Sequence, residues 1–90
     1  NTHHGSSLAH AMIAAALVGD AALVKQIGTA LGDDGPRRIA EALAELAGRE
    51  GRLQLQSAST AIAELGRRGL LDLTKVRAAA QGTPVANVLG

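Results

Sequence analysis

Apolar residues in this chain come in short runs that glycines interrupt at nearly regular intervals. Within each run the apolar positions recur every three or four residues, which is the period of an amphipathic helix. Glycine is favoured just after a helix because it has no Cβ to oppose a positive φ. The punctuating glycines are Gly19, Gly32, Gly48, Gly69 and Gly82, and the helices they predict span residues 8–18, 21–31, 36–47, 52–68 and 74–80.

The first predicted helix is apolar on every side, since His10 is the only polar residue between Leu8 and Val18. A helix of this kind is normally buried all round. Two interpretations follow: the helix is the centre of a bundle, or Leu8, Met12 and Ala15 form a seam between two copies of the chain. A third interpretation, binding to a membrane surface, lacks the basic stripe that such helices carry.

The next predicted helices carry recognisable start signals. Asp20 stands at the N-cap position of the second helix, and Pro36 suits the first position of the third because it has no N–H to leave unpaired. In that third helix Arg37 and Glu41 are four residues apart, which predicts an ion pair on a solvated face.

Residues 70–90 allow two interpretations. Asp72 or Thr74 could cap a short helix, and the sequence Thr83-Pro84 could start a last helical turn. Alternatively, residues 75–77 and 83–88 could pair as a β-hairpin. Residues 78–80 are three consecutive alanines, which are poor strand formers, so the pattern favours helix.

These signals predict an all-α fold: a compact orthogonal bundle of five to six short helices. Residues 1–6 are expected to form a flexible N-terminal segment and residues 7–90 a single helical domain, because 90 residues supply one core and not two.

The composition limits how stable such a bundle can be. The chain is 47% hydrophobic but contains no aromatic residue, so its core is built from aliphatic side chains and many alanines. Each alanine buries little area, and burial stabilises by roughly 0.8 kcal/mol per CH₂. We therefore expect the chain to pair with itself or with a partner protein. With no cysteine, disulfides and thiolate metal sites are excluded.

The net charge of +1 is unevenly distributed. Residues 1–34 carry one cation against three carboxylates, whereas residues 35–90 carry eight cations against five. This imbalance permits an anionic partner on the C-terminal part without requiring one. No apolar run approaches the roughly 18 residues of a membrane-spanning helix. We expect no membrane partner and a cytoplasmic location.

The third predicted helix, the short turn 48–51 and the fourth helix together resemble a helix-turn-helix. In that family the second helix lies in the major groove of duplex DNA and its first residues touch base edges. The resemblance implies a DNA-binding regulatory domain, and we expect this domain to act as a dimer through the first helix. The resemblance assigns base contacts to Arg52, Gln56, Ser59 and Thr60 and phosphate contacts to Arg49, Arg67 and Arg68.

A second resemblance points in the same direction. The segments Ser59–Leu65, Arg67–Leu71 and Gly82–Thr83 look like the recognition helix and wing of winged-helix repressors. The competing interpretation is that Arg67 and Arg68 only complement the negative end of their helix dipole. A helical protein-interaction or oligomerisation domain without any nucleic-acid role is therefore the alternative function.

Catalytic patterns are weak, and we expect no enzyme. Glu41 and Glu45 share a helix face but have arginine neighbours, which indicates ion pairing more than acid-base chemistry. Ser57, Ser59 and Thr60 have no evident activating base, because the histidines all lie in the N-terminal stretch. These histidines are His3, His4 and His10. We expect no cofactor and no metal site.

Overall fold

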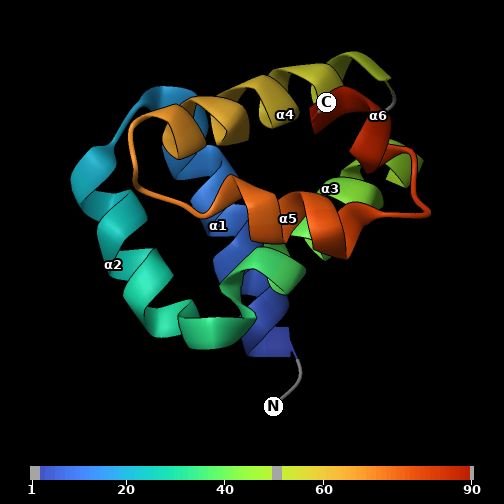
Figure 1. The fold of residues 1–90 in the computed structure, drawn as a ribbon. Helices are drawn as coiled ribbons and strands as arrows, with labels where there is room; N and C mark the ends of the chain where they lie inside the picture. The colour runs from blue at the N-terminus through green and yellow to red at the C-terminus, as the bar shows by residue number, and fades with distance from the viewer. Residues whose placement is uncertain (1–2, 50–51, 90) are drawn as a thin grey trace.

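The computed structural model describes residues 3–49 and 52–89, and these form helices joined by short connections (Figure 1). The described part of the chain holds six α-helices, one 3₁₀ turn and no strand, so the expectation of an all-α fold is confirmed. The elements are α1 (His3–Val18), α2 (Ala21–Leu31), η1 (Gly32–Asp34), α3 (Gly35–Arg49), α4 (Arg52–Arg67), α5 (Leu73–Ala80) and α6 (Val85–Leu89).

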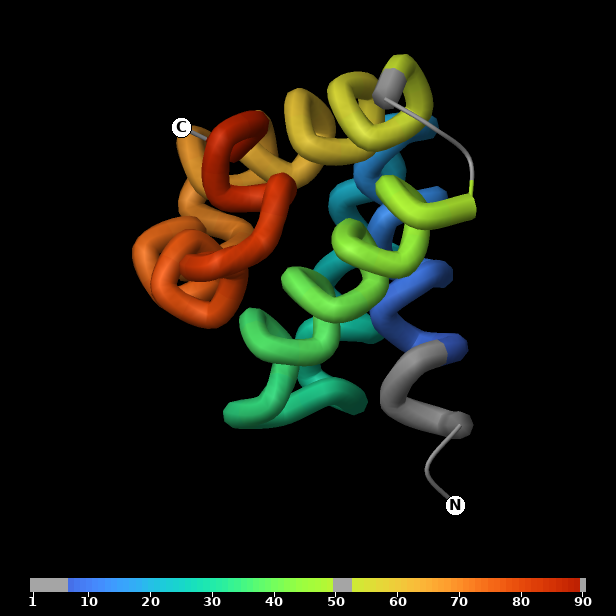
Figure 2. Tube along the Cα trace, turned by 90° about the vertical axis from the view of Figure 1, so that its right-hand side faces the viewer, coloured from blue at the N-terminus to red at the C-terminus, as the bar shows by residue number. Residues whose placement is uncertain are grey.

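The expectation that α1 is buried on every side is wrong, because Ala14, Leu17 and Val18 are exposed. Helix α1 packs against α2, α3 and α4. It begins at His3, so the helix starts earlier than predicted and residues 3–6, expected to be flexible, belong to it. Figure 2 shows α1 and α3 beside each other, with α4 crossing their upper ends.

The core fills the space between these helices with aliphatic side chains. The largest fully buried ones include Met12 of α1, Ile39 and Leu43 of α3, and Ile62 of α4. Helices α5 and α6 also contribute to this core, through the buried side chains of Val76 and Val85. The radius of gyration of 11.5 Å is near the about 12 Å expected for a folded chain of this length.

Two of the predicted helix ends follow the same hydrogen-bonding pattern. At Gly19 (φ 75°) and Gly69 (φ 76°), two backbone N–H groups beyond each helix donate back to carbonyls of its last turn. This Schellman arrangement requires positive φ at the glycine, which explains why glycine stands there. The prediction for Gly48 is wrong, because α3 continues through it to Arg49.

The start signals are largely confirmed. The Asp20 carboxylate accepts the backbone N–H of Leu23 at 3.1 Å, and the Asp72 carboxylate accepts that of Lys75 at 3.3 Å. The hairpin interpretation of the C-terminal part is wrong, since α5 and α6 are helical. The wing of the winged-helix resemblance is wrong for the same reason: Gly69 leads through a turn into α5.

Candidate functional site

Helix α4 carries most of the residues expected to contact DNA bases, and some of these residues are exposed whereas one is buried. Gln56 and Thr60 are exposed. Ser59 is only 1% exposed, so its assignment to a base contact is wrong. It lies one helical turn from both Leu55 and Ile62, on the side of α4 that faces the core. The side chain of Arg52 lies outside the described residues.

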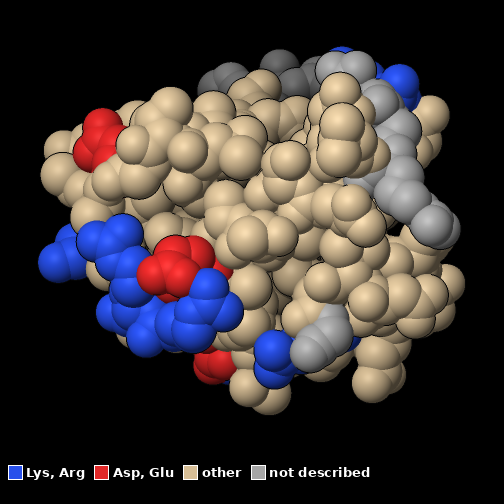
Figure 3. Space-filling model, turned by 90° about the horizontal axis from the view of Figure 1, so that it is seen from above, with Lys and Arg blue, Asp and Glu red and all other residues tan. Residues whose placement is uncertain are grey.

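The predicted phosphate-binding arginines do not converge on one surface. Arg49 ends α3 and sits beside the start of α4, whereas Arg67 and Arg68 lie at the other end of α4. A helix of 16 residues is about 24 Å long. In Figure 3 basic side chains gather at one end of the upper face and recur at the far corner, and a wide uncharged area separates them.

Carboxylates on the same helices already partner two of these arginines. Arg67 Nε donates to Glu64 Oε1 at 3.0 Å, and Arg49 Nη1 donates to Glu45 Oε1 at 3.2 Å. Arg68 is exposed and lies next to the Arg67–Glu64 pair in sequence. The exposed side of α4 therefore presents cations together with a carboxylate, which lowers its attraction for phosphate.

The expected ion pair between Arg37 and Glu41 is confirmed, with 2.9 Å between Nη1 and Oε2. Arg37 also donates to Asp34 at 3.1 Å. The hydrogen bond to Asp34 and the charges of both carboxylates raise the pKa of Arg37 above its ordinary value. All three side chains are exposed, so this cluster is a solvated group of ion pairs at the junction of η1 and α3.

The dimer seam predicted on α1 is wrong as assigned. Met12 and Ala15 are buried in the core of the single chain, and Leu8 is half-buried against that core. The exposed apolar side of α1 lies elsewhere on the helix. Leu17 is 53% exposed and Val18 is 78% exposed.

The exposed side of α1 opens onto an apolar groove between α1, α3 and α4. Two adjoining hollows of about 230 and 260 Å³ form it, and both are lined by Leu17 and Leu46. Leu53, which is 71% exposed, lines the second hollow. We call this surface the Leu17 groove; its remaining lining residues are His10, Ile13, Ala14, Arg49, Gln54, Ser57 and Ala58.

One edge of the Leu17 groove carries charges of both signs. Glu45 lies between two groove residues: its Oε1 is 3.6 Å from His10 Nε2 of α1 and 3.2 Å from Arg49 Nη1. All three side chains remain partly exposed. The groove therefore combines an apolar floor with a carboxylate and a guanidinium side by side.

Sequence reasoning missed the Leu17 groove because three separate helices build it. Leu17 belongs to a helix with apolar residues on every side, so its pattern does not show which side faces solvent. Leu53 stands alone in a polar segment, and a single exposed leucine is ordinary. The available signal was that Leu53 falls outside the buried stripe of Leu55, Ile62 and Leu65 on its own helix.

Within the described residues, no cluster of three or more histidines, cysteines, aspartates or glutamates could hold a metal ion. Among the described helices, none has the length and apolarity needed to cross a membrane. Comparisons with protein-family models, with curated proteins and with solved structures yield no match to this chain.

Proposed function

We propose that this chain is a helical oligomerisation module that binds a second copy of itself through the Leu17 groove. The observation that carries the proposal is the meeting of Leu17, Leu46 and Leu53 from three helices on one concave surface. Contiguous exposed apolar surface of this kind typically marks an interaction site.

The shape and charge of the Leu17 groove favour a second copy as its occupant. A two-fold dimer needs a self-complementary surface. Here the exposed Leu53 side chain lies beside a hollow that could receive the Leu53 of the other copy. Glu45 and Arg49 lie on the same edge. A two-fold axis at this edge would place Glu45 of each copy opposite Arg49 of the other copy. The net charge of +1 gives little repulsion between copies.

Sedimentation equilibrium of the wild-type chain and of Leu53→Glu tests this proposal. Burying a leucine side chain stabilises by about 1.5–3 kcal/mol, and the two-fold arrangement uses Leu53 twice. We expect Leu53→Glu to raise the dissociation constant of the dimer by at least about a hundredfold. Leu23→Glu is the matched control, since this exposed leucine of α2 lines neither hollow and should leave the dimer unchanged.

A charge exchange tests the pairing across the axis. Arg49→Glu alone should weaken its own dimer because like charges then face each other. Mixing Arg49→Glu with Glu45→Arg should restore a dimer that contains one of each. A wild-type chain that stays monomeric at high micromolar concentration would rule out the proposed function.

DNA binding through α3 and α4 as a helix-turn-helix is the second candidate function. The exposure of Gln56, Thr60, Arg67 and Arg68 favours it. The test is to measure duplex DNA binding over a range of salt concentrations. The slope of the logarithm of the binding constant against the logarithm of the salt concentration should fall in magnitude by about 1 for each phosphate contact that is lost. The pair Arg67→Ala plus Arg68→Ala should therefore lower the magnitude of this slope by about 2, and Arg77→Ala on α5 serves as control. No binding at low salt would exclude this candidate.

A further inference from the structure

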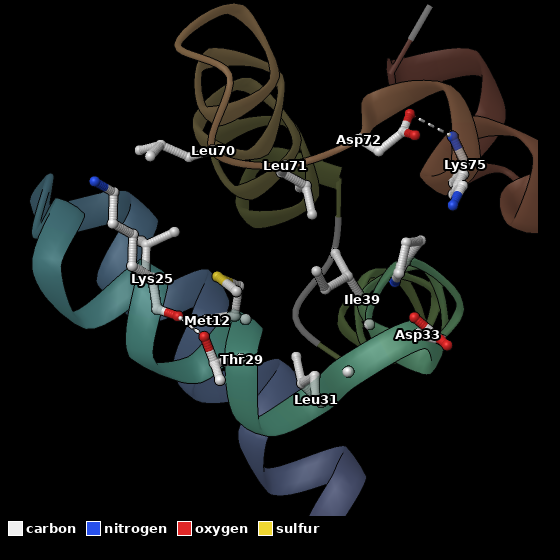
Figure 4. A pocket seen from close by; sticks show the side chains of 15 residues that line it. Met12, Lys25, Thr29, Leu31, Asp33, Ile39, Leu70, Leu71, Asp72 and Lys75 are labelled. Atoms are coloured by element: carbon white, nitrogen blue, oxygen red, sulfur yellow. Dashed lines mark hydrogen bonds between the residues drawn. The ribbon is translucent and has the colours of Figure 1, made fainter.

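A second hollow, separate from the Leu17 groove, lies between α2 and residues 70–72, which lead into α5. The described residues of α2 and α5 make no contact with each other, and the hollow is a pocket of about 510 Å³ (Figure 4). This volume falls within the about 300–1,000 Å³ typical of small-molecule sites. The pocket opens on one side of the bundle and is bounded below by α1 and α3.

Apolar side chains form about half of the lining of this pocket, and polar groups form the rest. Half-buried Leu31, Leu70 and Leu71 line it from the end of α2 and from the segment between α4 and α5. Met12 lies at its base, and Figure 4 shows the Met12 and Leu71 side chains directed into the same space. Gly28 adds no side chain to the wall, so the end of Met12 reaches to within 3.7 Å of where a Gly28 Cβ would be.

Charges stand at the mouth of the pocket in an asymmetric arrangement. Lys25 projects from α2 on one side, and no carboxylate of the described residues lies within 4.0 Å of it. Lys75 is on the other side, together with Asp33 and Asp72 (Figure 4). The side formed by Lys25 is therefore positive, whereas the opposite side carries two carboxylates against one ammonium and is net negative.

We propose that this pocket binds a small amphipathic monoanion, such as a medium-chain aliphatic carboxylate. Its hydrocarbon part would lie against Leu31, Leu70 and Leu71, and its carboxylate would pair with Lys25. Burial of the hydrocarbon supplies the affinity, and the ion pair with Lys25 fixes the direction in which the ligand enters. This site is independent of the Leu17 groove, so either proposal stands if the other fails.

The test follows the methyl group of Met12, the only methionine in the sequence. The whole chain labelled with ¹³C at the methionine methyl is titrated with octanoate below its micelle concentration. We expect a saturable shift of the Met12 signal and a nuclear Overhauser effect between that methyl and octanoate methylenes. No saturable shift of the Met12 signal at millimolar octanoate would overturn the proposal.

Two comparisons test the role of Lys25. Lys25→Glu should weaken octanoate binding at least tenfold, and because Lys25 is exposed this variant should fold normally. Arg77→Glu makes the same charge change on α5 outside the pocket and should leave the affinity unchanged. Octanol, which lacks the charge, should bind at least tenfold more weakly than octanoate. Equal affinity of Lys25→Glu and the wild type would contradict the proposed ion pair.

Discussion

At the scale of single residues, Ser59 is the least expected side chain in the structure. Its hydroxyl is buried, and it has no hydrogen-bond partner among the described residues. A buried hydroxyl without a partner costs about 1–3 kcal/mol, because folding removes its bonds to water and replaces them with nothing. Because Ser59 is buried, fewer residues of α4 are exposed for contact with DNA than the sequence predicted.

Ser59→Ala should therefore stabilise the protein by about 1 kcal/mol. The change removes the unpaired hydroxyl and replaces serine with a better helix former. Urea unfolding followed by far-ultraviolet circular dichroism measures it, which suits a chain without aromatic residues. Ser7→Ala, at an exposed position of α1 outside both hollows of the Leu17 groove, should change the stability by less than about 0.5 kcal/mol. Loss of stability in Ser59→Ala would mean that the hydroxyl has a partner.

Two helical glycines should respond in opposite directions to replacement by alanine. At Gly66 a Cβ would lie 2.8 Å from the Cβ of Leu73, an atom that cannot move without shifting α5. We expect Gly66→Ala to destabilise by about 1–3 kcal/mol. At Gly48, inside α3, a Cβ would meet nothing within 4 Å, so Gly48→Ala should stabilise by about 0.5–1 kcal/mol. The same urea experiment measures both, and equal effects would contradict the close approach of α4 and α5.

At the scale of helices, the sequence predicted most positions because their signals are local. Asp20, Gly19 and Gly69 each act on the turn next to them, and the bounds of α2 agree with the prediction at both ends. The predicted helix end at Gly48 is wrong because a glycine inside a helix lowers the stability by only about 1 kcal/mol, which packing can offset. What the sequence could not predict was the exposed side of α1, since Met12 and Leu17 are equally apolar and only the neighbouring helices distinguish them.

The N-cap of α2 offers a test at this scale. Asp20→Ala should destabilise the protein by about 0.5–2 kcal/mol, because the N–H of Leu23 then loses its acceptor. Asp20→Ser keeps a side-chain oxygen at the cap and should recover most of the loss. Thermal unfolding of the three proteins compares them, and equal losses in both variants would show that the Asp20 charge matters and its hydrogen bond does not.

At the scale of the whole molecule, dimerisation would make stability depend on protein concentration. If two folded copies associate and unfolded chains do not, mass action stabilises the folded state as concentration rises. We expect Tm to increase by about 2–5 °C for a tenfold increase in concentration. The Leu53→Glu variant should show no such increase. A concentration-independent Tm in the wild type would argue against the dimer even if the groove binds another protein.

Because α2 does not contact α5 among the described residues, we expect α2 to unfold locally more easily than the rest of the bundle. Helix α2 rests mainly on α1 and buries only Val24 and Ile27, with no support from the helices at the C-terminal end. Segments with few buried contacts open at lower free energy than the whole molecule. The backbone amides of α2 should therefore exchange with deuterated water well before those around Ile39 and Leu43, as one cooperative unit that unfolds while the rest of the bundle stays intact.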